Sequence, residues 1–400
     1  MGIKHHVQLS MTAGLGPVLI RRLIATLGDA ERACAASVRD LQQVEGIGSH
    51  RASTIYPALQ QAAAQVEGEL QRATDAGAYV ICFDDHDYPE LLRTIPDPPA
   101  VLYVKGAIEA RDLNAVGIVG SRRCSIYGRE QAERFGALLA GAGFTVISGG
   151  ARGIDTAAHH GALLTGIGRT IAVLGSGLDV PYPAENANLF DQIATRGAVL
   201  SEYPMGTPPL PDNFPRRNRI VSGMSRGILV VEADVRSGAL ITARQAADDH
   251  NRPVFAVPGR LDNAMSAGPH KLIRDGAVLV TCLEDILESL EPFPQDVYDD
   301  DAPEGDDEPG DAPDIDGVLG DLPGVPDAPE TAAGKQTPSA LLLTERQTKI
   351  VDALDDSGTS IDQIMDRAGL AAHEILQELT LLSLRGVIKR VDGQSYARRS

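Results

Sequence analysis

The 400-residue chain has few cysteines and no long apolar run, and these two features argue against a disulfide-rich, zinc-binding or membrane-spanning protein. The four cysteines, Cys34, Cys82, Cys124 and Cys282, lie far apart and form no CxxC pair, so neither a disulfide framework nor a zinc ribbon is indicated. No apolar stretch reaches the roughly 18 residues of a membrane span, and no basic flank followed by an apolar stretch opens the sequence. We therefore expect a cytoplasmic protein with reduced thiols and no membrane contact.

Positive charge is scarce overall, but the excess acid is concentrated in one segment. The net charge is −19, and the segment from Asp296 to Glu330 holds 14 Asp and Glu and no Lys or Arg, which leaves −5 for the rest of the chain. The segment is also rich in Pro and Gly, a composition that buries too little apolar surface to offset its ordering entropy. We expect an acidic disordered linker at 291–338, and a nucleic-acid partner for the remainder stays possible.

Three enzyme templates fail in this sequence, two for want of a residue and one for its context. The one Gly-Lys pair, in Gly334-Lys335-Gln336, lacks the Ser or Thr that a phosphate-binding P-loop requires. A dinucleotide site needs an acidic residue after the second strand, and this strand ends at Ser148. The GxSxG match at Gly223–Gly227 leads into a strand, unlike a hydrolase elbow, so we interpret it as a helix-to-strand connection. We expect no catalytic residue and no cofactor.

Between 76 and 290, short apolar runs alternate with glycine-containing turns and helix-like stretches, which is typical of an α/β fold with a parallel, doubly wound sheet. Several runs are continuously apolar, as expected for strands covered on both faces. The predicted strands are Ala115–Val119, Phe144–Ile147, Thr170–Leu174, Ala198–Leu200, Ile228–Glu232, Pro253–Val257 and Ala277–Val280. We expect an extended Rossmann-like domain over 76–290.

Smaller units are expected on either side of this core. Residues 1–75 are helical in pattern, and the turn Gly46-Ile47-Gly48 resembles that of a helix-hairpin-helix or SAM-like domain, which binds a phosphate through its amides or serves as a docking module. Residues 339–400 show three helix-like stretches, Thr344–Asp355, Ser360–Ala368 and Ala371–Arg385, and two strands around Asp392-Gly393. This order predicts a winged helix. The acidic Asp362 and Asp366 on its second helix favour protein contact over duplex DNA.

Glycine, serine and arginine recur in the turns after the predicted strands, where ligands bind in an open parallel sheet. Glycine lets amides approach an anion, serine adds a donor and arginine supplies charge, so we expect a phosphate ligand. In the turn that follows Ser148, we interpret Asp155 as a helix N-cap. The adjacent His159 and His160 face different directions on a helix, so we expect them to hold no metal together. The turns are Gly120–Arg123, Ser148–Asp155, Gly175–Asp179, Ser201-Glu202 and Arg236–Gly238.

The segment Asn213–Ile220 concentrates three arginines beside one phenylalanine. Arginine forms a planar fork that matches phosphate oxygens, and an aromatic ring offers a face on which a base stacks. Such a cluster can also be a solvated face or a site for an acidic partner. Beside several anion-binding turns, a nucleic-acid strand is the better interpretation.

Taken together, these motifs resemble the DNA-processing protein A family, DprA, also called Smf. The resemblance covers about half of the chain, and the ordered set is highly specific although each motif alone is weak. The motifs that carry it are Val116–Arg122, Ser148–Asp155 with His159, Gly175-x-Gly177-Leu178-Asp179 with Tyr182-Pro183, Ser201-Glu202, Phe214-Pro215-x-Arg217-Asn218-Arg219, Val231–Ala233, Ser237-Gly238-x-Leu240-Ile241-Thr242, Val257–Gly259 and Gly268-Pro269-His270-x-Leu272-Ile273.

The resemblance implies a protein that binds single-stranded DNA without cleaving it, forms a homodimer and loads a RecA-type recombinase, notably in natural transformation. Some members carry lysines where this chain has Ala184 and Pro211, so its positive charge rests more heavily on arginines. The implied DNA site, with the turn after Arg236 added, comprises Gly120, Ser121, Arg122, Ser148, Gly149, Arg152, Gly153, Phe214, Arg217, Asn218, Arg219, Ser237 and Gly238.

Two other classes of function are alternatives. A phosphoribohydrolase of the lysine-decarboxylase-like group uses the same kind of sheet, but its PGGxGTxxE motif is missing, because Pro258-Gly259-Arg260-Leu261 stops after one glycine. A scaffold that only docks a recombinase would bind its partner without affinity for DNA. The segment around Phe214 favours the DNA-binding protein.

Overall fold

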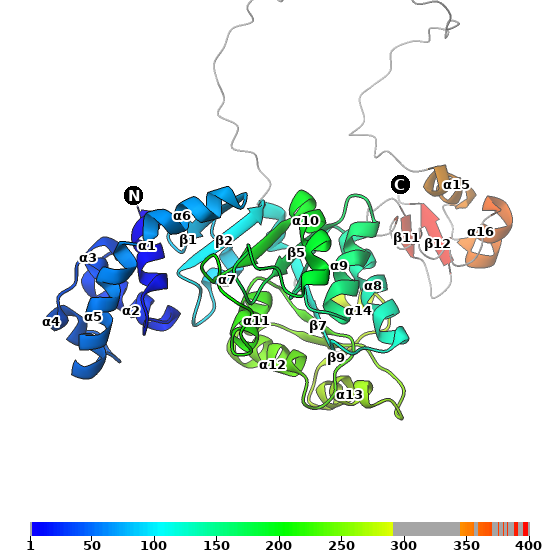
Figure 1. The fold of residues 1–400 in the computed structure, drawn as a ribbon. Helices are drawn as coiled ribbons and strands as arrows, with labels where there is room; N and C mark the ends of the chain where they lie inside the picture. Colours follow the sequence, from blue (N-terminus) through cyan, green and yellow to red (C-terminus); the bar gives the residue numbers. More distant parts are fainter. Residues whose placement is uncertain are drawn as a thin grey trace, which may run out of the picture. The chain divides into compact units, whose positions relative to one another are not determined.

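The computed structural model describes residues 2–290 and, toward the C-terminus, 345–355, 359–369, 388–390 and 395–398 with the single positions Ile375, Leu379 and Leu382. Residues 1–292 form one compact unit and residues 293–400 another (Figure 1). The predicted acidic linker lies outside the described residues, as do most of the third predicted C-terminal helix and the turn Asp392-Gly393.

A nine-stranded sheet lies at the centre of the first unit, in the order β1-β2-β6-β5-β4-β3-β7-β8-β9. Neighbouring strands from β6 through β9 run parallel, whereas β2 is antiparallel to both β1 and β6. The strands are β1 (Ala78–Cys82), β2 (Val101–Gly106), β3 (Ala115–Val119), β4 (Thr145–Ser148), β5 (Arg169–Val173), β6 (Ala198–Ser201), β7 (Ile228–Val230), β8 (Val254–Ala256) and β9 (Val278–Leu279).

The predicted α/β fold with a mostly parallel sheet is confirmed, and each of the seven predicted runs overlaps a strand. The strands β1 and β2 were not predicted from the sequence. Both strands pair antiparallel at one side of the sheet, and only the four-residue helices α7 (Glu90–Arg93) and η1 (Ala110–Leu113) follow them, so they lack the alternation with longer helices that marks the parallel strands. Antiparallel edge strands on an otherwise parallel sheet are common.

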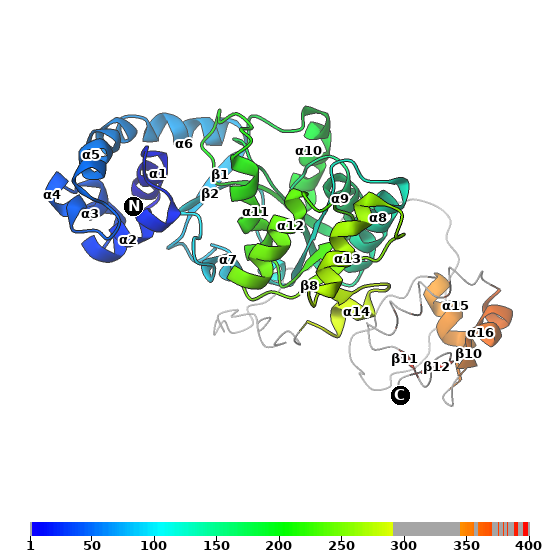
Figure 2. The same ribbon diagram turned by 90° about the horizontal axis from the view of Figure 1, so that it is seen from below.

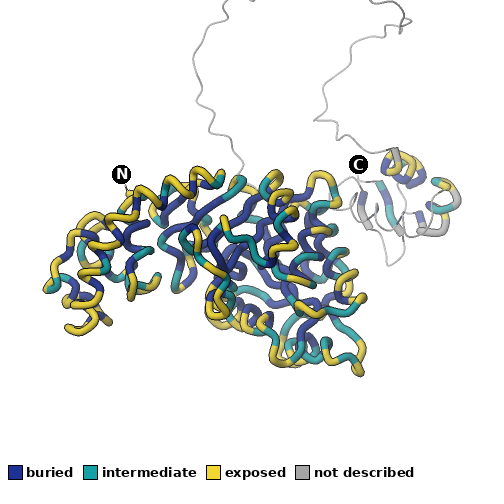
Figure 3. Tube along the Cα trace, in the orientation of Figure 1, coloured by how far each residue is buried: buried dark blue, intermediate teal, exposed yellow. Residues whose placement is uncertain are grey.

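Helices cover both faces of the sheet, and the buried residues lie between the layers (Figures 1 to 3). Alternate residues of β3 serve the two cores: Val116 and Ile118 pack toward α8 and α9, and Ala115 and Val119 pack toward α11 and α12. The first layer contains α8 (Ile126–Gly141), α9 (Ile154–Leu164), α10 (Ala187–Arg196) and α14 (Glu284–Leu287); the second contains α7 (Glu90–Arg93), α11 (Asn213–Gly223), α12 (Gly238–Arg244) and α13 (Ala267–Arg274).

Short helical turns complete the connections between these layers. Three are 3₁₀ helices, η1 (Ala110–Leu113), η2 (Ala184–Asn186) and η4 (Ala264–Ser266), and one is a π-helix, η3 (Gln245–Asp249), which continues α12. The predicted helix-to-strand connection at Gly223–Gly227 is confirmed, because this segment joins α11 to β7.

Six helices precede the sheet and belong to the same compact unit. The turn Gly46-Ile47-Gly48 joins α4 to α5, with Gly46 at φ +90° and Ile47 buried. The buried Glu69 on α6 accepts a hydrogen bond from the amide of Met205 at 2.7 Å, which ties this part to the loop after β6. The helices are α1 (Gly2–Met11), α2 (Pro17–Leu27), α3 (Ala30–Cys34), α4 (Val38–Gln42), α5 (Ser49–Ala63) and α6 (Val66–Asp75).

In the second unit, the described residues form a small three-stranded antiparallel sheet and two helices. The strand order is β10-β12-β11, so β12 pairs with both neighbours. The apolar core includes Ile350, Ile364 and Ile388. The elements are α15 (Glu345–Ala353), β10 (Thr359–Ser360), α16 (Ile361–Ala368), β11 (Ile388–Arg390) and β12 (Ser395–Arg398).

The close packing of α8 on α9 depends on glycine. A Cβ at Gly161 would lie 2.0 Å from the Glu133 carbonyl oxygen. We predict that Gly161→Ala lowers the free energy of unfolding by about 1 to 3 kcal/mol, measured by urea denaturation, because the helices must move apart. Gly68→Ala on α6 is the control, since a Cβ there meets no atom within 4 Å. It should be neutral or stabilising by about 0.5 to 1 kcal/mol; an equal loss in both variants would contradict the packing argument.

Candidate nucleic-acid interface

A cleft of about 870 Å³ lies at the carboxyl ends of β3, β4 and β7. From β3 the chain adds β4, β5 and β6 on one side, and then returns to place β7 on the other side of β3. This reversal is the topological switch point of an open α/β sheet, where the loops on either side diverge and leave room for a ligand. The fold therefore places the cleft where a parallel sheet of this order binds its ligands.

The cleft brings together most of the predicted site residues from loops and helices that are distant in sequence. The turn after β3 supplies three residues, the turn after β4 one, the first turns of α11 three, and the start of α12 two. The predicted residues that line the cleft are Gly120, Ser121, Arg122, Gly149, Phe214, Arg217, Asn218, Ser237 and Gly238.

An arginine and two aromatic rings form one wall of the cleft. The Arg122 guanidinium carbon lies 4.8 Å from the centre of the Phe214 ring, within the range of a cation–π interaction. The rings of Phe214 and Tyr182 have centroids 5.5 Å apart and are tilted by 51°. A Cβ at Gly175 would lie 3.1 Å from the Phe214 ring, so this glycine leaves room for it. Arg122 is exposed and Phe214 half-buried, which leaves both accessible to a ligand.

Arg217 also lines the cleft, but its guanidinium forms hydrogen bonds mainly to other groups of the protein. One terminal nitrogen donates to the carbonyl oxygens of Gly149 and Val173, and Nε donates to the Asn218 side chain at 3.2 Å. Burial lowers the pKa of Arg217 to about 10, an effect that the neighbouring Asp155 opposes. Arg217 remains protonated at neutral pH, so it holds the ends of β4 and β5 together and adds positive charge beneath the cleft.

The interpretation of Asp155 as a helix N-cap is wrong. Gly153, at φ +77°, is the N-cap of α9, and Asp155 lies inside the first turn, where its carboxylate accepts from the Ala151 amide at 3.3 Å. Two residues with positive φ, Gly150 and Gly153, shape the turn, and this shift is not apparent from the sequence. Burial raises the pKa of Asp155 to about 6, although the Arg217 guanidinium opposes that rise.

Glycine in these turns serves packing more than phosphate contact. A Cβ at Gly120 would lie 2.5 Å from Ile154, and one at Gly149 would lie 2.5 Å from Arg217. The amides expected to face an anion are engaged inside the protein: the Ser121 amide donates to the Glu232 carbonyl oxygen at 2.6 Å. The amide of Arg123 similarly donates to the Ser121 hydroxyl at 3.1 Å. Side-chain charge therefore remains as the main attraction for an anion at the turn after β3.

Three predicted site residues from the turn after β4 do not line the cleft. Ser148 is buried and donates its hydroxyl proton to the Ile118 carbonyl oxygen at 2.6 Å. Gly153 packs so closely that a Cβ would lie 2.4 Å from the Ser121 carbonyl oxygen. Arg152 is exposed but forms a two-pronged ion pair with Glu185, with N–O distances of 2.5 and 2.7 Å. These residues shape the turn or its rim.

Arg219 also lies outside the cleft, contrary to its predicted place in the DNA site. Its side chain is 6 % exposed and pairs with Glu202 at 2.5 Å and Asp97 at 3.1 Å. The Phe214 segment begins α11. Residues two apart on a helix point in nearly opposite directions, so Arg217 and Arg219 cannot face the same cleft.

Glu232, part of the Val231–Ala233 motif, forms the site in a way that was not predicted from the sequence. Its buried carboxylate accepts hydrogen bonds from the Ser125 amide at 2.8 Å, the Ser125 hydroxyl at 2.7 Å and the Asn263 amide group at 2.9 Å. Together with the backbone bond to Ser121, these contacts fix both ends of the turn that carries Arg122. A charged residue ending an otherwise apolar strand was the available signal in the sequence.

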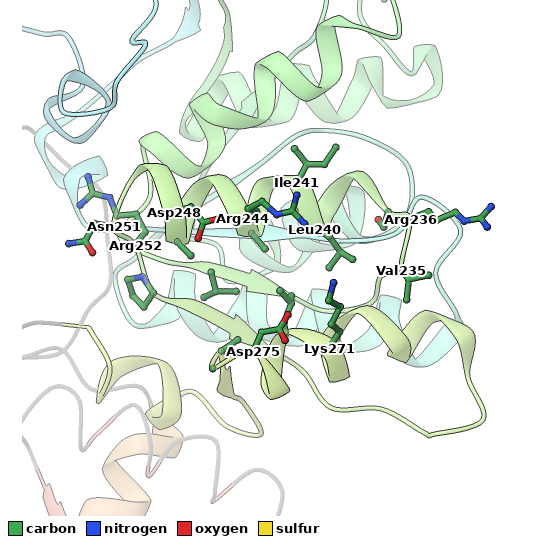
Figure 4. Close-up of a pocket in the computed structure, with 18 residues that line it drawn as sticks. Val235, Arg236, Leu240, Ile241, Arg244, Asp248, Asn251, Arg252, Lys271 and Asp275 are labelled. Carbon is green, nitrogen blue, oxygen red and sulfur yellow. The ribbon is translucent and has the colours of Figure 1, made fainter.

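A second groove, of about 730 Å³, lies between α12 with its π-helical extension and α13 (Figure 4). Leu240 projects into it, and charges of both signs line it, including Arg244, Asp248, Lys271 and Asp275. Its lining contains no aromatic residue. It therefore lacks the ring surface that the cleft at the switch point offers to a base.

The remaining expectations concern metals, thiols and membranes. Within the described part of the chain, no three His, Cys, Asp or Glu residues lie close enough to hold a metal ion. His159 is buried against Thr170 at 2.7 Å, while His160 is exposed. All four cysteines are unpaired. The helices that the structure describes include none with the length and apolarity to cross a membrane.

The different environments of two arginines give a stability prediction. Arg219→Ala leaves Glu202 buried without its partner, so we expect the free energy of unfolding to fall by about 3 to 5 kcal/mol. Arg122→Ala removes an exposed side chain and should change it by less than about 0.5 kcal/mol. Chemical denaturation of both variants is the measurement. Equal stability of the two would show that the Arg219 ion pairs contribute nothing.

Comparison with known proteins identifies the family. The family model of the DNA recombination-mediator protein A matches residues 79–291, and that of the DprA winged helix domain matches residues 333–394, which confirms the predicted winged helix. A protein named Smf from Synechocystis sp. is 38 % identical over 396 residues, covering 98 % of this chain and 97 % of its own length. Smf from Escherichia coli is 39 % identical over 331 residues, covering 82 % and 79 %.

A solved structure agrees. The X-ray structure of DNA processing protein A from Streptococcus pneumoniae superimposes with a TM-score of 0.65 at 35 % identity, covering 73 % of this chain and all of the other. The family model spans more than half of the sequence, and the Synechocystis relative matches over nearly its whole length. The chain therefore belongs to the DNA recombination-mediator protein A family, DprA or Smf.

Proposed function

We propose that this protein binds single-stranded DNA in the cleft at the switch point. The observation that carries the proposal is the stack of Arg122 on Phe214, beside Tyr182, in a cleft that the Gly120 and Gly149 turns border. A guanidinium neutralises a phosphate, and a ring accepts an unpaired base on its face. Bases in a duplex are already stacked and paired, so this combination favours a single strand.

The contacts divide among a few residues. Arg122 is the principal phosphate contact, Phe214 the stacking residue, and Arg217 a buried charge that attracts the backbone without leaving its carbonyl partners. Asn218, Ser237 and Gly238 line the cleft near the path of the strand. Since stacking and charge tolerate any sequence, little base discrimination is expected.

We further propose that the protein acts in the cytoplasm as a homodimer that protects an incoming strand and loads a RecA-type recombinase, as in natural transformation and recombination. Membership of a family of recombination mediators supports this role. We propose no catalytic step. The alternative is a phosphoribohydrolase, but this chain lacks the motif of those enzymes. Release of free base from nucleoside monophosphates, detected by chromatography, would support that alternative.

Binding through phosphates makes the affinity depend on salt. We predict that a gel-shift titration shows preference for single-stranded over duplex oligonucleotides, and that log affinity falls linearly with log salt by about 0.7 per neutralised phosphate. Arg122→Ala should lower that slope by about 0.7. Arg111→Ala is the matched control, because this exposed arginine precedes the amino end of β3, at the opposite edge of the sheet. A slope that is flat for the unaltered protein would refute the proposed mechanism.

The buried Asp155 adds a pH dependence. Its carboxyl titrates near pH 6, so acidification neutralises it while Arg217 stays charged, and the cleft gains one positive charge. We predict that affinity for single-stranded DNA rises about threefold between about pH 7.5 and 5.5, beyond any change in the variant Asp155→Asn. The variant should bind at neutral pH as the unaltered protein does at low pH. If the affinity of both proteins changed equally with pH, a group other than Asp155 would be responsible.

A further inference from the structure

Two large exposed side chains lie on segments tied to the turn that carries Arg122. Tyr127, in the first turn of α8, is 42 % exposed, and Leu261, in the loop after β8, is 94 % exposed. Neither lines the cleft assigned above. We call Tyr127 and Leu261 the Tyr127 shelf.

The shelf is physically continuous with the cleft. The turn of Arg122 and Arg123 runs directly into α8, whose N-cap is Ser125, and Tyr127 follows two residues later. Glu232 joins the two sides, because its carboxylate binds both Ser125 and Asn263, which is in the same loop as Leu261. Any movement of the turn relative to the shelf would break these buried hydrogen bonds.

The Tyr127 ring is held in place although it is exposed. Its hydroxyl donates to the Pro258 carbonyl oxygen at 2.8 Å. The next residue, Gly259, lies beside the edge of the ring, because a Cβ at that position would be 4.0 Å from it. An aromatic ring fixed at the surface loses little freedom when a flat partner stacks on it, which is the property of a base-stacking platform.

The charge near the shelf suits a nucleic-acid backbone. Arg123 is exposed, and its guanidinium has no hydrogen-bond or ion-pair partner within the part of the chain that the structure describes. Arg260 is paired with Asp262 at 2.9 Å in the same loop, so this pair adds no net charge. Arg123, which lines the cleft, is therefore the cation available to a phosphate on the way to the shelf.

We propose that the Tyr127 shelf is a second stacking site, which binds a base of the same single strand after it has passed Arg122 and Arg123. The proposal rests on the function proposed above and adds an exit path along the carboxyl edge of the sheet, toward the loop after β8. Tyr127 supplies the ring, Leu261 an apolar edge and Arg123 the phosphate contact. A protein ligand, by contrast, would bind the shelf whether or not a DNA strand occupied the cleft.

The test uses oligonucleotides of two lengths and the full chain. The short oligomer, of about 3 nucleotides, is chosen to occupy the Phe214 ring alone, and the long one, of about 20 nucleotides, to occupy both stacking sites. Tyr127→Ala should weaken binding of the long oligomer about tenfold and that of the short oligomer less than twofold, measured by fluorescence anisotropy. Tyr127→Phe keeps the ring and loses the hydroxyl bond that holds it, so it should bind the short oligomer like the unaltered protein and the long oligomer with a loss smaller than that of Tyr127→Ala.

Two further measurements separate the possible failures. 2-Aminopurine placed at successive positions of the long oligomer should show one stacking position lost in Tyr127→Ala and a different one lost in Phe214→Ala. Leu261→Ser should weaken binding of the long oligomer and leave binding of the short one unchanged. This variant tests the shelf without removing the Tyr127 hydrogen bond. If Tyr127→Ala binds both lengths like the unaltered protein, the shelf is refuted while the cleft stands. If the unaltered protein binds neither oligomer, the proposed function itself fails.

Discussion

The buried guanidinium of Arg217 is the contact on which the rest of the cleft depends. It joins the carbonyl oxygens of Gly149 and Val173, at the ends of adjacent strands, and lies beside the carboxyl of Asp155. Gly149 has to lack a side chain for this arrangement to fit. A buried charge is tolerated only when hydrogen bonds and a counter-charge compensate its lost hydration. The ends of β4 and β5, the first turn of α9 and the turn at Gly149 are therefore held in one arrangement. The accessible residues, Arg122 and Phe214, are positioned around it.

The parallel part of the fold was predictable because its physical signal is local. Each strand from β3 to β9 is a short apolar run, and a run buried on both faces is recognisable without knowledge of its neighbours. The edge strands β1 and β2 were missed, because antiparallel pairing at the side of a sheet leaves no comparable alternation with helices. The position of the cleft followed from the order of the turns, since carboxyl ends of parallel strands share one edge.

The roles of individual arginines were less predictable. Arg217 and Arg219 look equivalent in sequence, yet one lines the cleft and the other is buried against Glu202 and Asp97. The difference comes from the helix that the segment adopts and from acidic partners distant in sequence. Glu232 was missed for a related reason, because its value lies in contacts to two separate loops. Residue type indicates what a side chain can bind, and only the fold decides whether it is free to do so.

The antiparallel extension of the sheet has a consequence for solubility. An open sheet ends in unpaired amides and carbonyls, which can recruit strands of other molecules and so start aggregation. Here one border is β9, whose two residues offer too short a template. The other border is β1, and α1 and α6 pack on the face that β1 shares with β2 through Val7, Val66 and Ala73. The antiparallel pair β1-β2 therefore occupies the edge of β6, and a chain shortened to the parallel core would leave that four-residue edge free to pair with strands of other molecules.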